Sequence, residues 1–572
     1  MIDRGRPVWA FKTDARRDVD EYSPPWCDFA SFFSSRVDCD RTYLLAIDQE
    51  SNSREEWTVG QWRNAVYQVA DRLTAQHGVK AGDNVATLAG NSAEALALAF
   101  AVWLVGACLV PLDAHEKDDR HEDILQGSGA RWIGVGSGTE LISRAREHKS
   151  AETIFVSDLL SGQHREYLVP PLDKTKPPLD APALRIYTSG TSGEPKSVVL
   201  SMRSILLNCA SMQEAFGWTA TTRVLTVLPI NHVNGLLINC FLPWFAGGST
   251  VLLDKFRSSS FWSVASNTLA TSSSLVPTVL EFLLAHEFES RPETFLEEVI
   301  SGSGPLRPET ASAFEQRFGM PVRQIYGLSE TTAVLTVTPP RAAGHLEPEF
   351  RKSVGTVVPH AQVKVVDSNG RMCDEGESGE IVARGGMLMA GYADNDTANI
   401  AAFKGGWFHT GDRGHWQRGP DTKVWFFVDG RIRETILRGG LTIAPHTIDA
   451  VVESHPRVRR AAAIPFANRW YGEEIAVFVV ANGHLEGTEL LDWCAERLDR
   501  QMCPKVVIFG NEMPLTSTGK PRRGLLAKQL SQQLTVYWDS AFRYPATHSA
   551  SESSSQSKPA ESSETNNDGF RD

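Results

Sequence analysis

The chain of 572 residues is poor in cysteine, with eight thiols scattered along its length. No two cysteines stand in a Cys-x-x-Cys arrangement, so the sequence offers neither a disulfide framework nor a cysteine-based zinc site. We expect the thiols to be mostly reduced and the protein to be cytoplasmic. Residues 1–6 lack the apolar core of a secretory signal, and the last three residues are not a Ser-Lys-Leu peroxisomal address.

Long apolar segments are also scarce. Residues 95–112 form an uncharged run that is as long as a membrane span. Gly106 and Pro111 interrupt this run, so the sequence predicts a buried helix, a turn and a buried strand instead. We therefore expect no membrane span.

A surplus of positive charge is absent too, because the formal net charge is −12. This argues against a general nucleic-acid binder. Apolar residues make up 42% and charged residues 22% of the chain, which is ordinary for a globular protein. A chain of this length exceeds one hydrophobic core and predicts two or more domains.

A stretch of small hydroxylated residues and glycines follows a short apolar strand at 184–187. The stretch consists of Thr188, Ser189, Gly190, Thr191, Ser192 and Gly193. Such residues let backbone N–H and side-chain O–H groups converge on an anion, and Lys196 adds a positive charge. The pattern is not a GxxxxGK[ST] loop, because Pro195 stands where that loop needs glycine. The sequence favours a polyphosphate site over an ordinary surface loop.

Three further segments carry polar groups after strands or tight turns. Residues 322–332 deliver Tyr326, whose ring can pack on a purine, and Glu330, which becomes a Mg²⁺ ligand if it lies beside phosphates. Asp412 ends a glycine turn and suits two ribose hydroxyls. The Gly-Lys loop at 519–520 is suited to carrying the charge of Lys520 into a site on another domain; the alternative for Lys520 is a basic exposed turn.

The order of elements is typical of an α/β protein. Residues 58–112 predict helix, strand, turn, helix and strand, with Thr58 as N-cap of the first helix. From about residue 355 the pattern changes to short strands and turns. Residues 1–40 read as an irregular segment, and residues 544–572 as a disordered tail rich in Ser and Glu.

Six motifs in one order, over roughly residues 57–530, resemble those of the adenylate-forming superfamily, which includes acyl- and aryl-CoA ligases, luciferases and peptide-synthetase adenylation domains. The resemblance implies an α/β fold with a large N-terminal domain of β-α-β subdomains at 41–431. It implies a hinge at 432–434 around Arg433, and a small mobile α+β lid at 435–543.

The resemblance also implies roles for further residues. It places Gly302, Ser303 and Gly304 along the adenine, and Arg431 on the ribose. Gly327, Ser329 and Thr331 join the ATP site, and Thr188 joins Glu330 at the metal. The acyl pocket is expected at His232, Val233, Asn234, Gly235 and Gly327, and the pantetheine path at Gly439 and Gly440. Lys196, Glu330, His232 and Lys520 are the expected catalytic residues.

The implied activity is ATP- and Mg²⁺-dependent activation of a carboxylic acid as an acyl-adenylate, followed by transfer to CoA. Transfer to a carrier protein or an amine is the alternative, and a non-catalytic binding module is a third. We expect an aryl or medium acyl acid, because the residues at 235–241 and 302–304 are mostly apolar or small. An amino acid is not expected, because the segment around Asn231 and His232 lacks the aspartate that would hold its ammonium group. Two departures from the family pattern are Ser197, where glycine is usual, and Thr447, where glutamate is usual.

Overall fold

The computed structural model describes residues 23–114, 116, 118–136, 139–148, 150–160, 178–188, 196–287, 293–340, 346–419, 421–439, 441–515, 519–540 and 546–549. The chain divides into two compact units. The large unit comprises Met1–Arg433 with Ser517–Lys520, and the small unit comprises Glu434–Thr516 with Pro521–Asp572. The division falls inside the predicted hinge.

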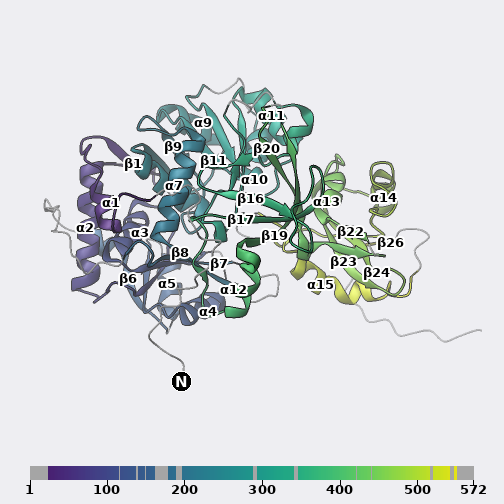
Figure 1. Ribbon diagram of the computed structural model, residues 1–572, viewed down its shortest axis with the longest axis horizontal. Helices are drawn as coiled ribbons and strands as arrows, with labels where there is room; N and C mark the ends of the chain where they lie inside the picture. Colours follow the sequence, from purple (N-terminus) through teal and green to yellow (C-terminus); the bar gives the residue numbers. More distant parts are fainter. Residues whose placement is uncertain are drawn as a thin grey trace, which may run out of the picture. The chain divides into compact units, whose positions relative to one another are not determined.

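A seven-stranded sheet of the large unit carries the predicted phosphate segment. Its order is β18-β8-β7-β4-β3-β5-β6. The strands are β3 (Asn84–Leu88), β4 (Cys108–Pro111), β5 (Trp132–Val135), β6 (Glu152–Phe155), β7 (Pro182–Thr188), β8 (Lys196–Ser201) and β18 (Gly391–Tyr392). The strands from β7 to β6 are parallel, whereas β8 runs antiparallel to both β7 and β18. Figure 1 shows β7 and β8 side by side.

The helices that flank these strands begin and end at residues the sequence marks. Thr58 caps α2 (Val59–Ala75) by accepting from the backbone of Gln61, as predicted. The apolar run forms α3 (Ala93–Val105), which ends at Gly106 with φ 86° and leads into β4. The remaining helices here are α4 (Asp118–Ser128), α5 (Thr139–Glu147) and α6 (Val156–Leu160). Among the described residues, no helix is both long enough and apolar enough to cross a bilayer.

A nine-stranded sheet, of order β15-β14-β13-β12-β11-β9-β10-β1-β2, forms the other large layer. Its strands are β1 (Thr42–Asp48), β2 (Ser53–Thr58), β9 (Arg223–Thr226), β10 (Ser249–Leu253), β11 (Ser272–Leu275), β12 (Glu298–Ser301), β13 (Val322–Tyr326), β14 (Thr336–Val337) and β15 (Thr356–Val357). The strands from β10 to β13 run parallel, so their carboxyl ends meet at one edge. That edge is where α/β folds place ligands.

Helices and turns connect the strands of this sheet. They are α7 (Met202–Phe216), the π-helix η3 (Asn234–Phe241), α8 (Leu242–Ala246), α9 (Ser258–Asn267), α10 (Pro277–Ala285), α11 (Pro308–Phe318) and the 3₁₀ turns η4 (Ser329–Thr331) and η5 (Pro348–Lys352). The predicted helix at 204–216 is confirmed as part of α7.

The prediction of an irregular segment up to residue 40 is wrong for α1 (Phe29–Ser34). Phe29, Phe32 and Phe33 are buried in the main core of the large unit, where Phe33 stacks on Trp244 with 4.7 Å between ring centroids. Six residues are too few to show a helical period, and the charged residues around them hide the aromatic face. Residues 1–22 lie outside the described residues.

A four-stranded antiparallel sheet completes the large unit, in the order β16-β17-β19-β20. It consists of β16 (Gln362–Val366), β17 (Gly379–Arg384), β19 (Phe408–Arg418) and β20 (Val424–Arg431), with α12 (Asp396–Ala402) and the turn η6 (Lys404–Gly406) before β19. These are the short strands predicted after residue 355. The turn η7 (Ile432–Glu434) follows β20.

The small unit is an α+β structure built on one sheet (Figure 1). Its strands are β21 (Ile436–Arg438), β22 (Leu441–Ile443), β23 (Val458–Asn468), β24 (Gly472–Ala481), β25 (Val506–Phe509) and β26 (Ala546–Ser549); its helices are α13 (Pro445–Glu453), α14 (Gly487–Ala495) and α15 (Arg523–Thr535). The prediction of disorder from residue 544 onward is wrong for β26, because this strand pairs in parallel with β25. Backbone pairing at a sheet edge does not need apolar side chains. The rest of the tail lies outside the described residues.

Candidate active site

Two strands hold the ends of the predicted phosphate loop. Thr188 ends β7 and Lys196 begins β8, and the two residues face each other in register. The Thr188 hydroxyl also donates to the Lys196 carbonyl oxygen over 3.5 Å. The predicted loop residues between them, Ser189, Gly190, Thr191, Ser192 and Gly193, lie outside the described residues. Lys196 and Thr188 therefore stand together at the base of this connection.

Tyr392 connects Lys196 to Glu330. The Lys196 Nζ lies 4.6 Å from the centroid of the Tyr392 ring, a cation–π contact. The Tyr392 hydroxyl donates to Glu330 Oε1 over 2.9 Å. The ring is held in place because Tyr392 pairs with Val198, two residues after Lys196. Sequence reasoning missed this role, since a strand of two residues gives no periodic signal.

Glu330 lies in the turn η4, directly after β13. No partner of Glu330 Oε2 occurs among the described residues, so this oxygen offers a ligand to a cation. Carboxylate and hydroxyl oxygens are ligands that suit Mg²⁺, and Glu330 and Thr188 therefore fit the predicted metal pair in chemistry. Thr331 is different: it is buried, and its hydroxyl accepts from the Leu328 N–H and donates to the Leu328 carbonyl. That hydroxyl stabilises the turn η4, and the role of Thr331 at the nucleotide stays a prediction.

A second cluster joins Tyr326, Asp412 and Arg431. Asp412 on β19 and Arg431 on β20 are paired in register, and Arg431 Nε lies 2.8 Å from Asp412 Oδ1. The Tyr326 hydroxyl donates to Asp412 Oδ2 over 2.7 Å. Arg431 Nη1 also donates to the Thr410 carbonyl. The predicted residues from three separate motifs thus meet at one carboxylate.

Burial sets the electrostatics of this cluster. Burial raises the pKa of the Asp412 carboxyl, and the Arg431 guanidinium opposes that effect. Burial and the nearby Asp412 raise the pKa of Tyr326 well above its usual value, so the phenol keeps its proton and remains a donor. The cluster presents a buried carboxylate that is oriented by two donors.

The predicted adenine loop follows β12, next to β13. Ser303 adopts φ 66°, a left-handed conformation that is uncommon outside glycine, between Gly302 and Gly304. Gly327 sits where a Cβ atom would lie 1.9 Å from the Ala333 carbonyl oxygen, so no larger residue fits. Close backbone packing therefore fixes the turn between Tyr326 and Ser329. The Ser329 residue itself is half-buried.

His232 lies on the turn after β9, with Nε2 3.8 Å from Asp113 Oδ2. Burial lowers the pKa of His232, and Asp113 opposes that effect. The ring is therefore mainly neutral at pH 7. Asp113 was not among the predicted site residues, because it follows β4 and lies far from His232 in the sequence.

The predicted acyl segment contains a buried polar network. Asn234 begins η3, and its Oδ1 accepts from Ser274 on β11 over 2.9 Å and from Asn239 over 3.2 Å. Asn234 Nδ2 donates to Ser303 over 3.3 Å. A π-helix brings residues five apart onto one side, which explains the pairing of Asn234 with Asn239. Asn234 is thus a junction between three elements, a role that its predicted place in the pocket did not indicate.

The neighbours of Asn234 in the predicted acyl segment, Val233 and Gly235, are closely packed. Val233 packs partly buried against the main core. Gly235 is required by packing, since a Cβ atom there would lie 2.1 Å from the Pro229 carbonyl oxygen. This close approach explains why glycine follows Asn234.

Ser197, which replaces the usual glycine, has a buried partner. Arg185 Nε donates to the Ser197 hydroxyl over 3.1 Å, and Arg185 Nη1 donates to the Ser128 carbonyl over 3.0 Å. Both Arg185 and Ser197 are buried. The hydroxyl is therefore accommodated directly after Lys196.

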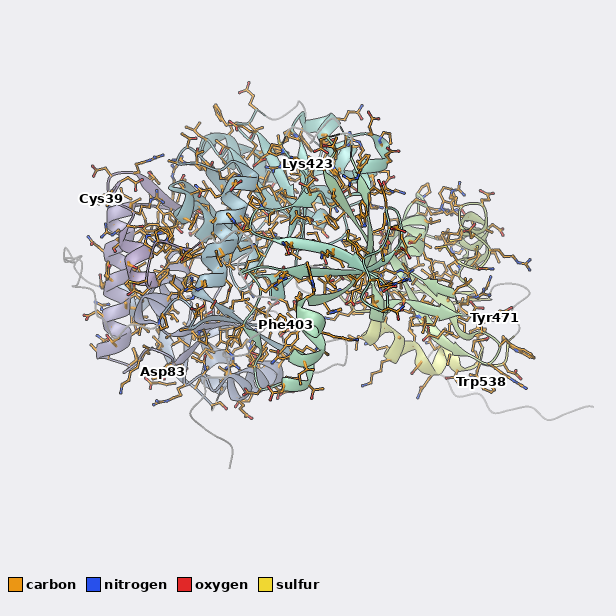
Figure 2. The ribbon with its side chains drawn as sticks, in the orientation of Figure 1. Cys39, Asp83, Phe403, Lys423, Tyr471 and Trp538 are labelled. Carbon is orange, nitrogen blue, oxygen red and sulfur yellow. The ribbon has the colours of Figure 1, made fainter. Side chains whose placement is uncertain are left out.

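In the small unit, Gly439 has φ 55° and donates to the Tyr471 carbonyl over 2.8 Å; Figure 2 labels Tyr471. Gly440 and the side chain of Arg433 lie outside the described residues. Lys520 is grouped with the large unit; it follows Gly519, which has φ 79°, and precedes Pro521, which forms an antiparallel bridge with Leu515. Thr447 lies in the first turn of α13.

Comparison with known proteins identifies the family. The chain matches the AMP-binding enzyme family over residues 34–393, and the AMP-binding enzyme C-terminal domain over residues 447–520. It is 30% identical over 487 residues to oxalate–CoA ligase of Arabidopsis thaliana, which covers 82% of this chain and 92% of that protein. It is 31% identical over 475 residues to indoleacetate–CoA ligase of Aromatoleum aromaticum, over 80% of this chain and 90% of that protein.

Solved structures agree with this result. The fold is similar to that of o-succinylbenzoate CoA synthetase from Bacillus subtilis in complex with the acyl-adenylate OSB-AMP, with a TM-score of 0.76 and 26% identity over 88% of this chain and 98% of that chain. The same enzyme has been solved with ATP and a magnesium ion, and matches with a TM-score of 0.76 over 86% of this chain and 98% of that chain. The predicted fold class and superfamily are confirmed. This chain belongs to the AMP-binding enzyme family and is a ligase of the AMP-forming acid–CoA type.

Proposed function

We propose that the protein activates an aryl or medium acyl carboxylic acid with ATP, releases pyrophosphate, and transfers the acyl group to the thiol of CoA. The observation that carries the proposal is the pairing of two clusters at the end of β13. One cluster connects Lys196, Tyr392 and Glu330, and the other connects Tyr326, Asp412 and Arg431. The first suits the phosphates of a nucleotide, and the second suits its ribose.

In the first step, a carboxylate oxygen of the acid attacks the α-phosphorus of ATP, and the bond from that phosphorus to pyrophosphate breaks. The approach of two anions is the main barrier, so positioned cations should lower it. Lys196 has a fixed position on the Tyr392 ring and can meet the phosphates without reorganising. Lys520 supplies the second charge, between the carboxylate and the α-phosphate.

Mg²⁺ would bind at Glu330 and Thr188, and when bound it would neutralise the departing pyrophosphate. Tyr392 holds Glu330 Oε1, which fixes the direction in which Oε2 points. Oε2 would then be the oxygen that meets the cation.

At the nucleoside end, Asp412 would accept from the ribose hydroxyls. A carboxylate has about four lone-pair positions, and Tyr326 and Arg431 occupy one on each oxygen, so two remain for ligand. Gly302, Ser303 and Gly304 would lie along the adenine, with the Tyr326 ring against it.

The acyl group would lie beside His232, Val233, Asn234, Gly235 and Gly327. The buried, largely apolar π-helix η3 supports an aryl or medium acyl chain. The neutral His232 avoids an ion pair that would hold the substrate carboxylate away from the phosphorus. Relatives named for oxalate, indoleacetate and 2-succinylbenzoate activate different acids, so the substrate class rests on this chain's own pocket.

In the second step, the CoA sulfur attacks the acyl carbonyl carbon, the bond from that carbon to AMP breaks, and the thiol proton leaves. Gly439 and Gly440 would border the pantetheine, after rotation of the small unit about Arg433. One observation keeps a second acceptor open: Thr447, in place of the usual glutamate, lies in the first turn of α13, close in sequence to Gly440. A carrier-protein thiol or an amine is the alternative acceptor.

The proposed location is the cytoplasm, and the proposed partners are small molecules rather than nucleic acids. All eight cysteines are free, and six are buried. Free thiols persist in a reducing compartment. The net charge of −12 supports the absence of a nucleic-acid partner.

The test is pyrophosphate release from ATP and Mg²⁺ across a panel of aryl, fatty and amino acids, each with and without CoA. We expect turnover only with aryl or medium acyl acids, and stimulation by CoA. Release that CoA does not stimulate would favour the alternative acceptor. Lack of release with every acid would contradict the adenylation step.

A further inference from the structure

Two histidines and an aspartate form a cluster in the large unit, apart from the residues proposed for ATP. Asp118 and His121 lie three residues apart on α4, and so on the same face of the helix. His148 directly follows α5. One ligand atom from each side chain lies within 4.8 Å of the other two. Both imidazoles are buried, with side-chain exposures of 0% for His121 and 3% for His148.

Hydrogen bonding fixes the tautomer of His121. Its Nε2 lies 2.8 Å from the Asp113 carbonyl oxygen, which can only accept, so Nε2 carries the proton. In the neutral ring, Nδ1 then holds a bare lone pair. That Nδ1 is buried without a hydrogen-bond partner among the described residues, and it faces Asp118 Oδ1 at 3.8 Å. The buried Nδ1 lone pair thus lacks a donor within the described residues, and a cation bound there would satisfy it.

His148, like His121, has one ring nitrogen near an acceptor and the other without a partner among the described residues. Its Nδ1 lies 3.5 Å from Glu122 Oε2, which favours the proton on Nδ1. Its Nε2 is buried and has no hydrogen-bond partner in the described part of the chain. An imidazole whose one nitrogen donates to a carbonyl or carboxylate, leaving the other bare, is the usual arrangement of a metal-binding histidine.

The surrounding charges are compatible with a cation. Within the described residues, the charged groups that contact the cluster are Glu122 and Arg144, whose Nη2 lies 2.7 Å from Asp118 Oδ1. Two carboxylates and one guanidinium leave one negative charge in excess. Arg144 bonds to Oδ1, so Asp118 Oδ2 remains for a metal.

We propose that Asp118, His121 and His148 bind a divalent transition-metal ion, with Zn²⁺ as the best fit. Two imidazole nitrogens and one carboxylate oxygen are borderline ligands, which suit Zn²⁺ or Co²⁺ rather than Mg²⁺ or Ca²⁺. The ion joins α4 to the end of α5. It also secures the backbone of Asp113, whose carboxylate lies 3.8 Å from His232. Its role is structural, and it is separate from the Mg²⁺ proposed at Glu330.

The test uses the full chain, freed of any purification tag, stripped with EDTA, and dialysed against Zn²⁺ or Co²⁺. We expect one ion per chain by elemental analysis, and a rise in melting temperature on addition of Zn²⁺, because the ion binds only the folded state. The Co²⁺ spectrum should show nitrogen and oxygen ligands. It should lack the thiolate band that binding at the exposed Cys27 or Cys39 would produce; Figure 2 labels Cys39.

Two variants and a control complete the test. His148→Ala and Asp118→Asn should each weaken Zn²⁺ binding by at least about 10- to 100-fold, since even loss of an outer partner has that effect. Each should also lose the Zn²⁺-induced rise in melting temperature. His77→Ala, which removes another histidine paired with a carboxylate (Glu152, 3.1 Å), should keep both. Lack of stoichiometric binding by the wild type, or unchanged binding in a folded variant, would overturn the proposal.

Discussion

At the scale of single residues, Tyr392 is the side chain that joins the two charges at the phosphate end of the site. The Lys196 ammonium packs over its ring, and its hydroxyl donates a hydrogen bond to Glu330. Neither contact involves the reacting atoms. Tyr392 is therefore a positioning residue, and its effect should appear in the response to Mg²⁺.

Tyr392→Phe keeps the ring under Lys196 but removes the hydrogen bond to Glu330. A hydrogen bond to a charged group contributes about 1.5–3 kcal/mol, so we expect adenylation to fall by about 10- to 100-fold. We also expect the Mg²⁺ concentration for half-maximal rate to rise. Pyrophosphate release over a Mg²⁺ series measures both.

Tyr67→Phe is the matched control, because Tyr67 is a buried tyrosine of α2 that contributes to the main core. It should leave the Mg²⁺ response unchanged. An unchanged Mg²⁺ response in Tyr392→Phe as well would remove Tyr392 from the account.

Candidate site residues could be predicted where a motif has fixed spacing, and their roles stay predictions. Glu330, Asp412 and Arg431 were all predicted, and the structure brings Asp412 and Arg431 into contact. Tyr392 and Asp113 were missed, because their importance comes from a partner distant in sequence. Single-sequence patterns do not encode such pairings.

At the scale of elements, α1 shows that the N-terminal part of the described chain belongs to the core. Phe33 is fully buried between Trp244 and neighbouring aromatic rings. Phe33→Ala should therefore destabilise the large unit by about 3–5 kcal/mol, the usual cost of deleting a buried phenylalanine. Urea-induced unfolding measures the change.

Val37→Ala offers a control close by, since Val37 is 78% exposed. It should change stability by less than about 0.5 kcal/mol. Similar losses for both variants would show that α1 does not pack as described.

The pairing of β17 with β19 carries a pH-dependent contact. Glu380 Oε2 lies 2.8 Å from His409 Nδ1, and this hydrogen bond raises the pKa of His409 above its usual value, against the effect of burial. A raised folded-state pKa stabilises the fold fully below about pH 6.5, where unfolded histidine is protonated. That contribution is lost as pH rises through the folded-state pKa.

His409→Gln should accordingly cost more stability at pH 6 than at pH 8.5. Urea unfolding of the wild type and the variant at both values gives the comparison. An equal loss at both pH values would mean that folding does not raise the pKa of His409.

Most elements were predictable because their signals are local. The capped helix α2 and the broken apolar run that forms α3 and β4 are examples. The elements that were missed, α1 and β26, are short and depend on tertiary partners. The π-helical form of η3 was also not indicated by its apolar composition.

At the scale of the whole molecule, the proposed first step depends on Lys520, which lies in the C-terminal part of the sequence. Lys520→Ala should lower acyl-adenylate formation by a hundred- to a thousand-fold, which corresponds to about 3–4 kcal/mol for one preorganised donor. ATP binding should be retained. Rapid-quench kinetics and equilibrium dialysis with ATP measure the two properties.

Lys528→Ala is the matched control, an exposed lysine on α15 of the small unit. It should leave adenylation unchanged. Undiminished adenylation in Lys520→Ala would exclude Lys520 from the first step while leaving the role of the large unit intact.

The most direct test of the central claim is a single-turnover experiment in two stages. Enzyme, ATP, Mg²⁺ and an acid from the active class are mixed without CoA, quenched, and analysed for acyl-adenylate by mass spectrometry. CoA is then added to a parallel sample. We expect that acyl-adenylate forms first, and that acyl-CoA and AMP replace it after CoA is added. Acyl-CoA formed without a preceding acyl-adenylate, or an acyl-adenylate that CoA does not consume, would contradict the proposed two-step reaction.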